Sequence, residues 1–403
     1  MSLTPYESEV SVYVGPEGLR VDVWDTIRVD LSMLEVGTAW TLSFWWSAEG
    51  RNAWDVLTDP GTGVKCGQRI TVTIDGDAVI SGIVETRVVG EQGANEPPKL
   101  VISGRDELGV ALSADADPAT LLRGRTVEAV LSDLYAQAGV VADIAESIAQ
   151  RPYQGRRAQR RGGWHQETRR TKTVRVAHPN IGEKIQQVVD RIVRSLGYRV
   201  WVAPGIESGH TAVIVDTPRA TGAPTMSLLR ELTATGDISD RSNLLWGNEQ
   251  TQIGDVPTRV TAYGDSQRGT KHADKFSHTV DNGTLYSEEN LRRIDTDLPE
   301  RPRYVRARGA STVAGARNEA ARVMAEANQR LRTYNGCATG FRQGGLLWIP
   351  NTRVTVRDDV ARVSEVMLLV KASFQQTPQG AQTTDVTLLP DGAVSVIPAE
   401  DES

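Results

Sequence analysis

The last quarter of the chain constrains the fold most strongly, because its apolar residues come in short runs that end at turn residues. A glycine pair at 344–345 precedes an apolar run that contains Trp348, and proline ends this run at Pro350 because it has no N–H to give to a sheet. Two more short runs, 354–358 and 365–370, follow. Short apolar runs bounded by such residues are typical of β-strands. We therefore expect consecutive β-strands here, with Trp348 in their core.

A second β-rich region covers residues 10 to 112, where apolar and polar residues alternate. One face collects Ile27, Val29, Leu31 and Met33, and the next strand places Trp40, Leu42, Phe44 and Trp46 together. This period of two predicts a half-buried antiparallel sheet. The Asp-Gly pair at 75–76 separates two β-rich runs and predicts a hairpin. Residues 99–106 follow as a closing strand.

The periodicity becomes helical between about residues 118 and 218. Thr126 is placed to cap a helix that Gly139 stops, with Val127, Val130, Leu131, Leu134 and Tyr135 on one face. A second helix has apolar residues spaced by three and four from Ile181 to Leu196 and ends at Gly197. Strands at 198–202 and 211–215 then form a hairpin, so we expect a small α+β module.

Residues 219 to 310 predict an irregular connector, with a strand at 258–264 opening the last domain. A long helix is expected at 311–334, where Val313, Ala316, Ala320, Val323, Ala327, Leu331 and Tyr334 are spaced by three and four. Its other face carries Arg317, Arg322, Glu326, Arg330 and Arg332. This charged face is either solvent-exposed or a contact with another subunit.

Composition bounds the class of protein without identifying it. With 403 residues, the chain has room for two to four domains of roughly 150 residues each. At 39% hydrophobic and 24% charged residues it is typical of globular proteins, and no apolar run approaches the ~20 residues of a membrane-spanning helix. The first residues lack the features of a secretion signal, so we expect synthesis in a cytoplasm. Its two cysteines, Cys66 and Cys337, are expected to be free thiols.

Short motifs at both ends of the chain resemble one protein family. They read W-x-x-I-x-V-x-x-S from Trp24, D-G-x-x-V-x-S-G from Asp75, S-G-R-D at 103–106, and G-F-R-x-G-G-L-L-W-x-P-N from Gly340. In this order they are similar to the baseplate hub proteins of Mu-like contractile-tailed phages. The positions that carry the resemblance most directly are Trp24, Asp75, Gly76, Gly82, Gly340, Arg342, Gly345, Leu347, Trp348, Pro350 and Asn351.

The resemblance implies a β-rich α+β fold, with two antiparallel β-barrel domains joined by a small α+β module and a helix-containing connector. The corresponding boundaries are a first barrel at 1–115, a middle domain at 116–218, a connector at 219–255 and a second barrel at 256–403. The middle domain holds an insertion at 145–178 that lies outside the resemblance, and the second barrel includes the helix at 311–334.

The resemblance also implies a structural function. Three chains would form a ring that adapts the sixfold tail tube to the threefold central spike, within the virion baseplate, and that lets genomic DNA pass. The expected partners are two further copies, the tail tube protein and the central spike protein, with baseplate wedge proteins and the tape measure protein as further candidates. A hub or spike adaptor of a phage-derived injection particle, or of a type VI-like system, is the alternative.

The insertion is the one charge anomaly in a chain of net charge −6. Between residues 151 and 175 there are nine Lys or Arg and one acid, Glu167. The candidate assembly residues in this segment are Arg156, Arg157, Arg160, Arg161, Trp164, Arg169 and Arg170. One interpretation is a loop that docks on acidic neighbours. The other, more distant interpretation is nucleic-acid binding through phosphate contacts and aromatic stacking.

An enzyme is not expected, because no combination of residues with catalytic spacing occurs. The sequence has no G-x-S-x-G, H-E-x-x-H or G-x-x-x-x-G-K-[ST] pattern, and its five histidines are scattered. Two of them, His272 and His278, lie in a polar segment and not on two rigid elements. We therefore predict no catalytic site, no cofactor and no metal site.

Overall fold

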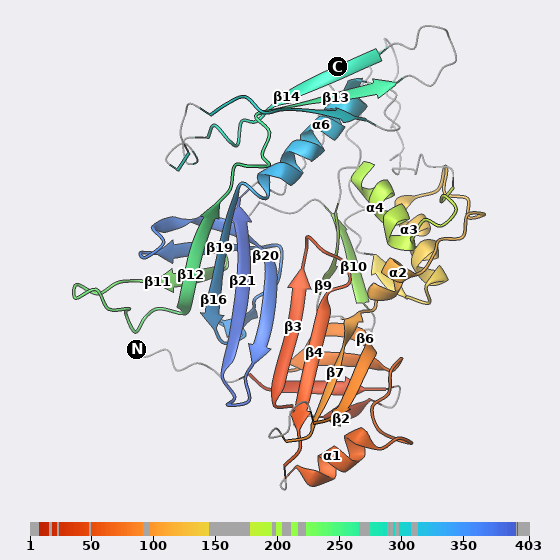
Figure 1. Ribbon diagram of the computed structural model, residues 1–403, viewed down its shortest axis with the longest axis vertical. Coiled ribbons are helices and arrows are strands. Elements are labelled where there is room, and N and C mark those ends of the chain that lie inside the picture. The colour runs from red at the N-terminus through yellow and green to blue at the C-terminus, as the bar shows by residue number, and fades with distance from the viewer. Residues whose placement is uncertain are drawn as a thin grey trace, which may run out of the picture.

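The computed structural model describes residues 8–391 and 393, apart from 16–17, 22–23, 48–49, 92–96, 145–177, 196–198, 204–210, 217–222, 266–274, 288–289, 291–292, 295–297 and 308–312. Its main feature is a 13-stranded sheet to which both β-rich regions contribute. In Figure 1 the red and orange part is the first β-domain, and the blue and green part beside it is the second. No helix in the described ranges is long and apolar enough to cross a membrane.

The first β-domain contains seven strands and one helix. They are β1 (Val10–Val14), β2 (Leu19–Val21), β3 (Thr26–Ser32), β4 (Ala39–Trp45), α1 (Arg51–Thr58), β5 (Arg69–Ile74), β6 (Asp77–Gly90) and β7 (Lys99–Asp106). The predicted alternation is confirmed: the apolar residues of β3 are buried, and so are Trp40, Leu42 and Phe44 of β4. Trp46 was wrongly assigned to this face. It follows the end of β4 and is 42% exposed.

The second β-domain contains eight strands. They are β11 (Met226–Arg230), β12 (Leu244–Thr251), β16 (Arg332–Thr339), β17 (Arg342–Gln343), β18 (Leu346–Leu347), β19 (Thr352–Asp358), β20 (Val363–Gln376) and β21 (Gln382–Pro390). Two of these strands, β11 and β12, lie in the segment that we expected to be a connector. Trp246 in β12 pairs with Cys337 in β16, and Met226 in β11 pairs with Val354 in β19, so both strands belong to the large sheet.

One strand connects the two β-domains. The first half of β20 pairs with β19, and its second half, from Lys371 to Gln376, pairs with β3. The pairing partner changes beside an irregularity between Leu369 and Lys371, and such a bulge bends a strand. The sheet therefore runs from β12 to β2 through β20 and β3. Side chains from both β-domains share one apolar core, so they pack as a single body.

A middle module follows the first β-domain and appears in yellow and green in Figure 1. Its elements are α2 (Gly109–Ser113), α3 (Val127–Gln137), β8 (Ala142–Ile144), α4 (Ile185–Ser195), β9 (Arg199–Ala203) and β10 (Thr211–Asp216). Thr126 caps α3 as predicted, since its Oγ1 accepts a hydrogen bond from Ala129 N at 3.3 Å. Ile181 does not belong to the second helix. It lies in a turn before α4 and is 92% exposed.

A cap module lies at the top of Figure 1. It consists of β13 (Arg259–Asp265), β14 (Lys275–Asp281), β15 (Pro302–Arg306) and α6 (Val313–Asn328). We expected β13 to open the second barrel, but it forms a separate three-stranded sheet with β14 and β15. The helix is also shorter than predicted. The chain leaves the helix after Asn328 and enters β16 at Arg332, so Tyr334 lies on a strand.

The predicted fold class is confirmed: the chain is β-rich, with a large antiparallel sheet and smaller α+β parts. Among the described strand pairs of this sheet, β11–β19 is the only parallel one. The pairings of the described strands give a continuous path through both β-domains. The predicted domain boundaries stay a proposal.

Candidate functional site

In the first β-domain, the motif glycines Gly82 and Gly104 both lie beside the side chain of Trp40. Trp40 is 1% exposed, and its Nε1 donates a hydrogen bond to Arg105 O at 3.2 Å. A Cβ on Gly82 would lie 2.6 Å from this nitrogen, and a Cβ on Gly104 would lie 1.9 Å from Ile83 O. Neither distance is compatible with a side chain. The glycines leave room both for the indole of Trp40 and for the close approach of the carbonyl groups of β6 and β7.

Motifs from the two ends of the chain meet where the β-domains join. The turn at Asp75 and Gly76, with φ of 52° and 86°, separates β5 from β6, and the turn at Gly344 and Gly345, with φ of 58° and 84°, separates β17 from β18. Both are tight hairpin turns that need positive φ. They lie close together, because Arg342 at the base of the second hairpin reaches the first turn.

Arg342 uses its whole guanidinium in this contact. Its Nε donates to Asp75 Oδ2 at 2.7 Å, and its Nη2 donates to Asp77 Oδ2 at 2.5 Å and to Ile74 O at 2.9 Å. The third nitrogen, Nη1, donates to Gly345 O at 2.7 Å within the same hairpin. Arginine suits this role because its planar fork donates in several directions at once. We call this contact the Arg342 clasp.

Two further polar contacts lie along the same junction. The Gln382 side chain of β21 accepts a hydrogen bond from Ser8 N at 2.8 Å and donates one to Ser8 O at 2.7 Å. The Ser373 hydroxyl of β20 donates to the carboxylate of Asp30 in β3. Together with the β20–β3 pairing, these contacts join the start of the chain to its last strands.

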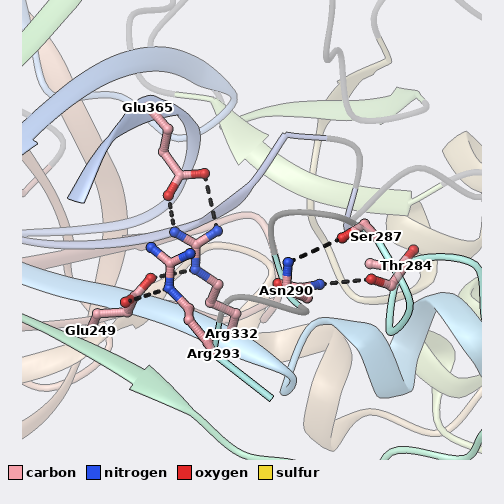
Figure 2. Close-up of polar contacts among 7 residues, drawn as sticks. All are labelled: Glu249, Thr284, Ser287, Asn290, Arg293, Arg332 and Glu365. Carbon is pink, nitrogen blue, oxygen red and sulfur yellow. Dashed lines mark hydrogen bonds and ion pairs between the residues drawn. The ribbon is translucent and has the colours of Figure 1, made fainter. Parts of the chain in front are cut away.

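A cluster of charges links the second β-domain to the segment between β14 and β15 of the cap module (Figure 2). Arg332 of β16 is 1% exposed and pairs with Glu249 of β12 and Glu365 of β20. Glu249 also accepts from Arg293 Nε at 2.9 Å. The segment that carries Arg293 is ordered by Asn290, whose Nδ2 donates to Thr284 O at 2.7 Å. Two arginines and two glutamates balance, so the burial of Arg332 leaves no net charge.

A second buried pair lies inside the same domain. Arg230 of β11 and Asp358 of β19 form a bidentate pair with distances of 2.8 and 2.7 Å, and Tyr334 donates to Asp358 Oδ2 at 2.6 Å. Burial alone would raise the pKa of Asp358. The hydrogen bonds from Arg230 and Tyr334 outweigh it, so the pKa of Asp358 is below its usual value. The pair is therefore ionised at neutral pH and ties β11 to β19.

The other motif residues have structural surroundings. Trp348 is fully buried, as predicted, within the shared core, and Leu347 and Trp24 are also buried there. Trp24 Nε1 donates to Val21 O at 3.2 Å. Gly340 has φ of 73° and Asn351 has φ of 70°, so each makes a left-handed turn. Pro350, beside Asn351, is buried.

The predicted basic segment cannot be placed against these contacts. Its candidate residues, Arg156, Arg157, Arg160, Arg161, Trp164, Arg169 and Arg170, lie outside the described residues. Within the described ranges, no group of three or more His, Cys, Asp or Glu is arranged to hold a metal ion. Both cysteines are free, with Cys66 exposed and Cys337 buried. Burial raises the pKa of Cys337 to about 12, and hydrogen bonding to Asp385 adds to this shift.

The charged cluster was missed by the sequence analysis. Arg332 was assigned to a helix face that was expected to be either solvent-exposed or a subunit contact, and Glu249 was placed in the connector. The available signal was the run from Arg332 to Thr339, in which Tyr334 and Ala338 also point into the core. A strand with an arginine on its apolar face requires acidic partners from neighbouring strands, and β12 and β20 supply them.

Comparison with known families gives one match. Residues 9–106 match the model of the N-terminal part of the Mu phage baseplate assembly protein GpP-like family. This range coincides with β1–β7, the part that carries the first three motifs. The first β-domain is therefore similar to the N-terminal part of that family. No curated protein matches the chain by sequence.

Solved structures extend the likeness to the whole chain. A tail protein from Neisseria meningitidis MC58 has a TM-score of 0.69 at 19% identity, covering 98% of this chain and 99% of that one. The 43 kDa tail protein of prophage MuSo2 from Shewanella oneidensis has a TM-score of 0.71 at 16% identity, covering 96% and 100%. The chain thus has the fold of phage tail proteins, and the predicted resemblance to the Mu-like baseplate family is confirmed.

A more distant likeness involves a complex from Francisella. A chain of the Francisella PdpA–VgrG complex has a TM-score of 0.53 at 8% identity. The match covers 99% of this chain but 60% of the Francisella chain, so the shared fold is one part of that longer protein.

Proposed function

We propose that the chain is the structural hub subunit of a contractile phage tail baseplate. In this proposal three copies form a ring, each contributing two β-domains, so that six similar domains surround one axis. Such a ring matches a sixfold tail tube on one side and a threefold spike on the other, and DNA passes along the axis during ejection. Closed cyclic symmetry repeats one interface without open-ended growth.

The observation that carries the proposal is the union of the two β-domains. They share one core and one continuous sheet, and the Arg342 clasp joins their turns. A hub transmits load between tube and spike, so its repeated domains need a fixed relative position. The GpP-like first β-domain and the tail protein fold of the whole chain support a baseplate location in the virion.

The partners proposed are further copies of this chain, the tail tube protein and the central spike protein. Wedge proteins and the tape measure protein are additional candidates, and genomic DNA is present only in transit. We propose no enzymatic activity, since the charged groups of the site are balanced ion pairs within the structure. The fold shared with a chain of the PdpA–VgrG complex supports the alternative, a hub in a phage-derived injection particle or type VI-like system.

Light scattering on purified protein tests the ring directly. We expect a mass three times that of the chain at micromolar protein. A purely monomeric protein, both alone and mixed with its tail tube protein, would contradict the trimer. Clearing of a cell-wall zymogram by the pure chain would contradict the absence of hydrolytic activity.

The basic segment 151–175 is proposed to serve assembly. Replacing Arg156, Arg157, Arg160 and Arg161 with Ser is expected to leave the fold intact and to weaken docking in the particle. If wild-type protein retained DNA in a steeply salt-dependent way, and the variant lost that retention but assembled normally, nucleic-acid binding would be its main role.

A further inference from the structure

The two small modules have the same strand layout. In the middle module β10 lies between β8, which is parallel to it, and β9, which is antiparallel. In the cap module β13 lies between β15, which is parallel, and β14, which is antiparallel. Each sheet is covered on one face by helices: Val200 and Val213 pack on α3 and α4, and Val260 and Ala262 pack on α6.

The second face of the two sheets differs. In the middle module Trp201 of β9 and Ile214 of β10 pack against the outer face of the large sheet, at Met33, Leu368, Val370 and Leu389. In the cap module the equivalent face carries Tyr263 of β13 and Tyr304 of β15, which are 46% and 65% exposed. Their ring centroids lie 6.3 Å apart. Arg306 lies beside Tyr263 in the register of β13 and β15.

This face has the composition of a protein contact. Tyrosine and arginine are, with tryptophan, the residues enriched where interfaces gain their binding energy. In the middle module, a face of this layout is covered by the outer side of a β-sheet of the same chain. The cap face therefore fits a second β-sheet surface with exposed apolar side chains.

The chain itself offers such a surface on β12, at one end of the large sheet. Leu245 and Trp246 of β12 are 50% and 46% exposed. The adjoining hairpin segment 231–243 is acidic, because Glu231, Asp237 and Asp240 outnumber Arg241. Among the described side chains of the cap face, Arg259 and Arg306 outnumber Asp281, so by this count the two surfaces have opposite net charge.

We propose that the cap face around Tyr263 and Tyr304 docks on the β12 surface around Trp246 of a second copy of this chain. This contact is heterologous, since it joins two different surfaces, and a contact of this kind gives a ring when the rotation between neighbouring copies closes after three copies. The inference rests on the proposed ring and specifies which surfaces form it.

The first test compares the association of variants by sedimentation velocity. Tyr263→Ser combined with Tyr304→Ser is expected to weaken self-association about tenfold or more, and Trp246→Ser is expected to do the same. The matched control is Tyr286→Ser, because Tyr286 is 43% exposed but lies in a loop outside the cap sheet. It is expected to associate like wild type.

The second test fixes which surfaces meet. In a Cys66→Ser background, protein with Tyr304→Cys is mixed with protein carrying Trp246→Cys and oxidised. A disulfide-linked dimer is expected in the mixture and in neither protein alone. A trimer that the tyrosine and tryptophan variants do not weaken, with no linked dimer, would overturn these surfaces and leave the ring standing. A monomeric wild type that gives no linked dimer would overturn both.

Discussion

The middle module and the cap module share a strand layout, yet they are attached to the large sheet in different ways. The middle module is held by apolar packing, through Trp201 and Ile214 against the outer face of β20, β21 and the end of β3. The segment between β14 and β15 of the cap is held by the pairing of Arg293 with Glu249 and by a small separate apolar cluster that includes Ile294 and Leu331. Apolar burial fixes the middle module firmly, whereas the cap keeps an exposed aromatic face for a partner.

The difference shows that strand layout alone does not decide how a module is used. Trp201 is 2% exposed, and Tyr304, on the corresponding face of the cap sheet, is 65% exposed. A small sheet with helices on one face has a second face that must be either buried or tolerant of water. Tyrosine tolerates water through its hydroxyl, and a buried tryptophan mainly adds apolar contact. The following variants test this contrast.

The largest effect is expected from Trp201→Ala. Removing a buried Trp typically costs about 3–5 kcal/mol, and here it would also open a cavity between the middle module and the large sheet. Urea unfolding followed by fluorescence measures the loss. Trp46→Ala is the control, because Trp46 is 42% exposed. If Trp201→Ala fails to fold, Trp201→Phe tests the same contact, and equal stabilities for Trp201→Phe and wild type would contradict it.

The second variant concerns Asp106, a buried carboxyl at the end of β7, where the chain enters the middle module. Burial raises the pKa of Asp106 to about 6, although it accepts hydrogen bonds from Thr38 N and Oγ1 at 2.9 Å and from Gly109 N at 3.1 Å. Because the pKa is higher in the folded state, the carboxyl contributes stability that is complete below pH ~4 and is lost as pH rises through 6.

Asp106→Asn removes this titration. The unfolding free energy of wild type, minus that of the variant, is expected to fall by up to about 3 kcal/mol between pH 4 and pH 7. Urea unfolding at several pH values provides the comparison, and Asp117→Asn is the control at an exposed site. A difference that does not change with pH would show that Asp106 is ionised throughout.

A smaller effect is expected for Arg293→Met. The substitution removes one of the two partners of Glu249 and leaves Arg332 in place, which is expected to cost about 1–3 kcal/mol. Arg303→Met on the exposed strand β15 is the control. Urea unfolding is the suitable measurement, since a denaturing salt would screen the charges. Equal stability of both variants would mean that charge does not hold the cap.

The smallest effect on stability is expected for Tyr304→Ala. An exposed substitution usually changes the unfolding free energy by no more than about 0.5 kcal/mol. The loss of unfolding free energy for Tyr304→Ala is to be compared with that for Trp201→Ala. Urea unfolding of dilute protein measures both, because association does not contribute at low concentration. A loss comparable to that of Trp201→Ala would mean that the tyrosine packs within its own chain.

The sequence predicted the parts that depend on local chemistry. Alternation gave β3 and β4, the Asp-Gly pair gave the turn between β5 and β6, and Thr126 and Gly139 bounded α3. The motifs included Arg342, Asp75 and Gly345 of the Arg342 clasp, but they did not predict the contact between Arg342 and Asp75. These two residues are 267 positions apart, and local sequence patterns carry no information about such a contact. The connector was misjudged for a similar reason. The polar residues of β12, such as Glu249, make sense only once Arg332 lies beside them.

The pairing of β20 with β3 has a consequence for biosynthesis. The edge of β3 is complete only after residues 371–376 have been made, about 270 residues after β7 ends. At ordinary rates of translation this takes roughly 15–50 s. During that interval the nascent first β-domain exposes an unpaired strand edge, which is a template for aggregation. A chain released before β20 has been made would therefore be prone to aggregate. Rapid synthesis of the C-terminal strands shortens the interval in which the growing chain can aggregate.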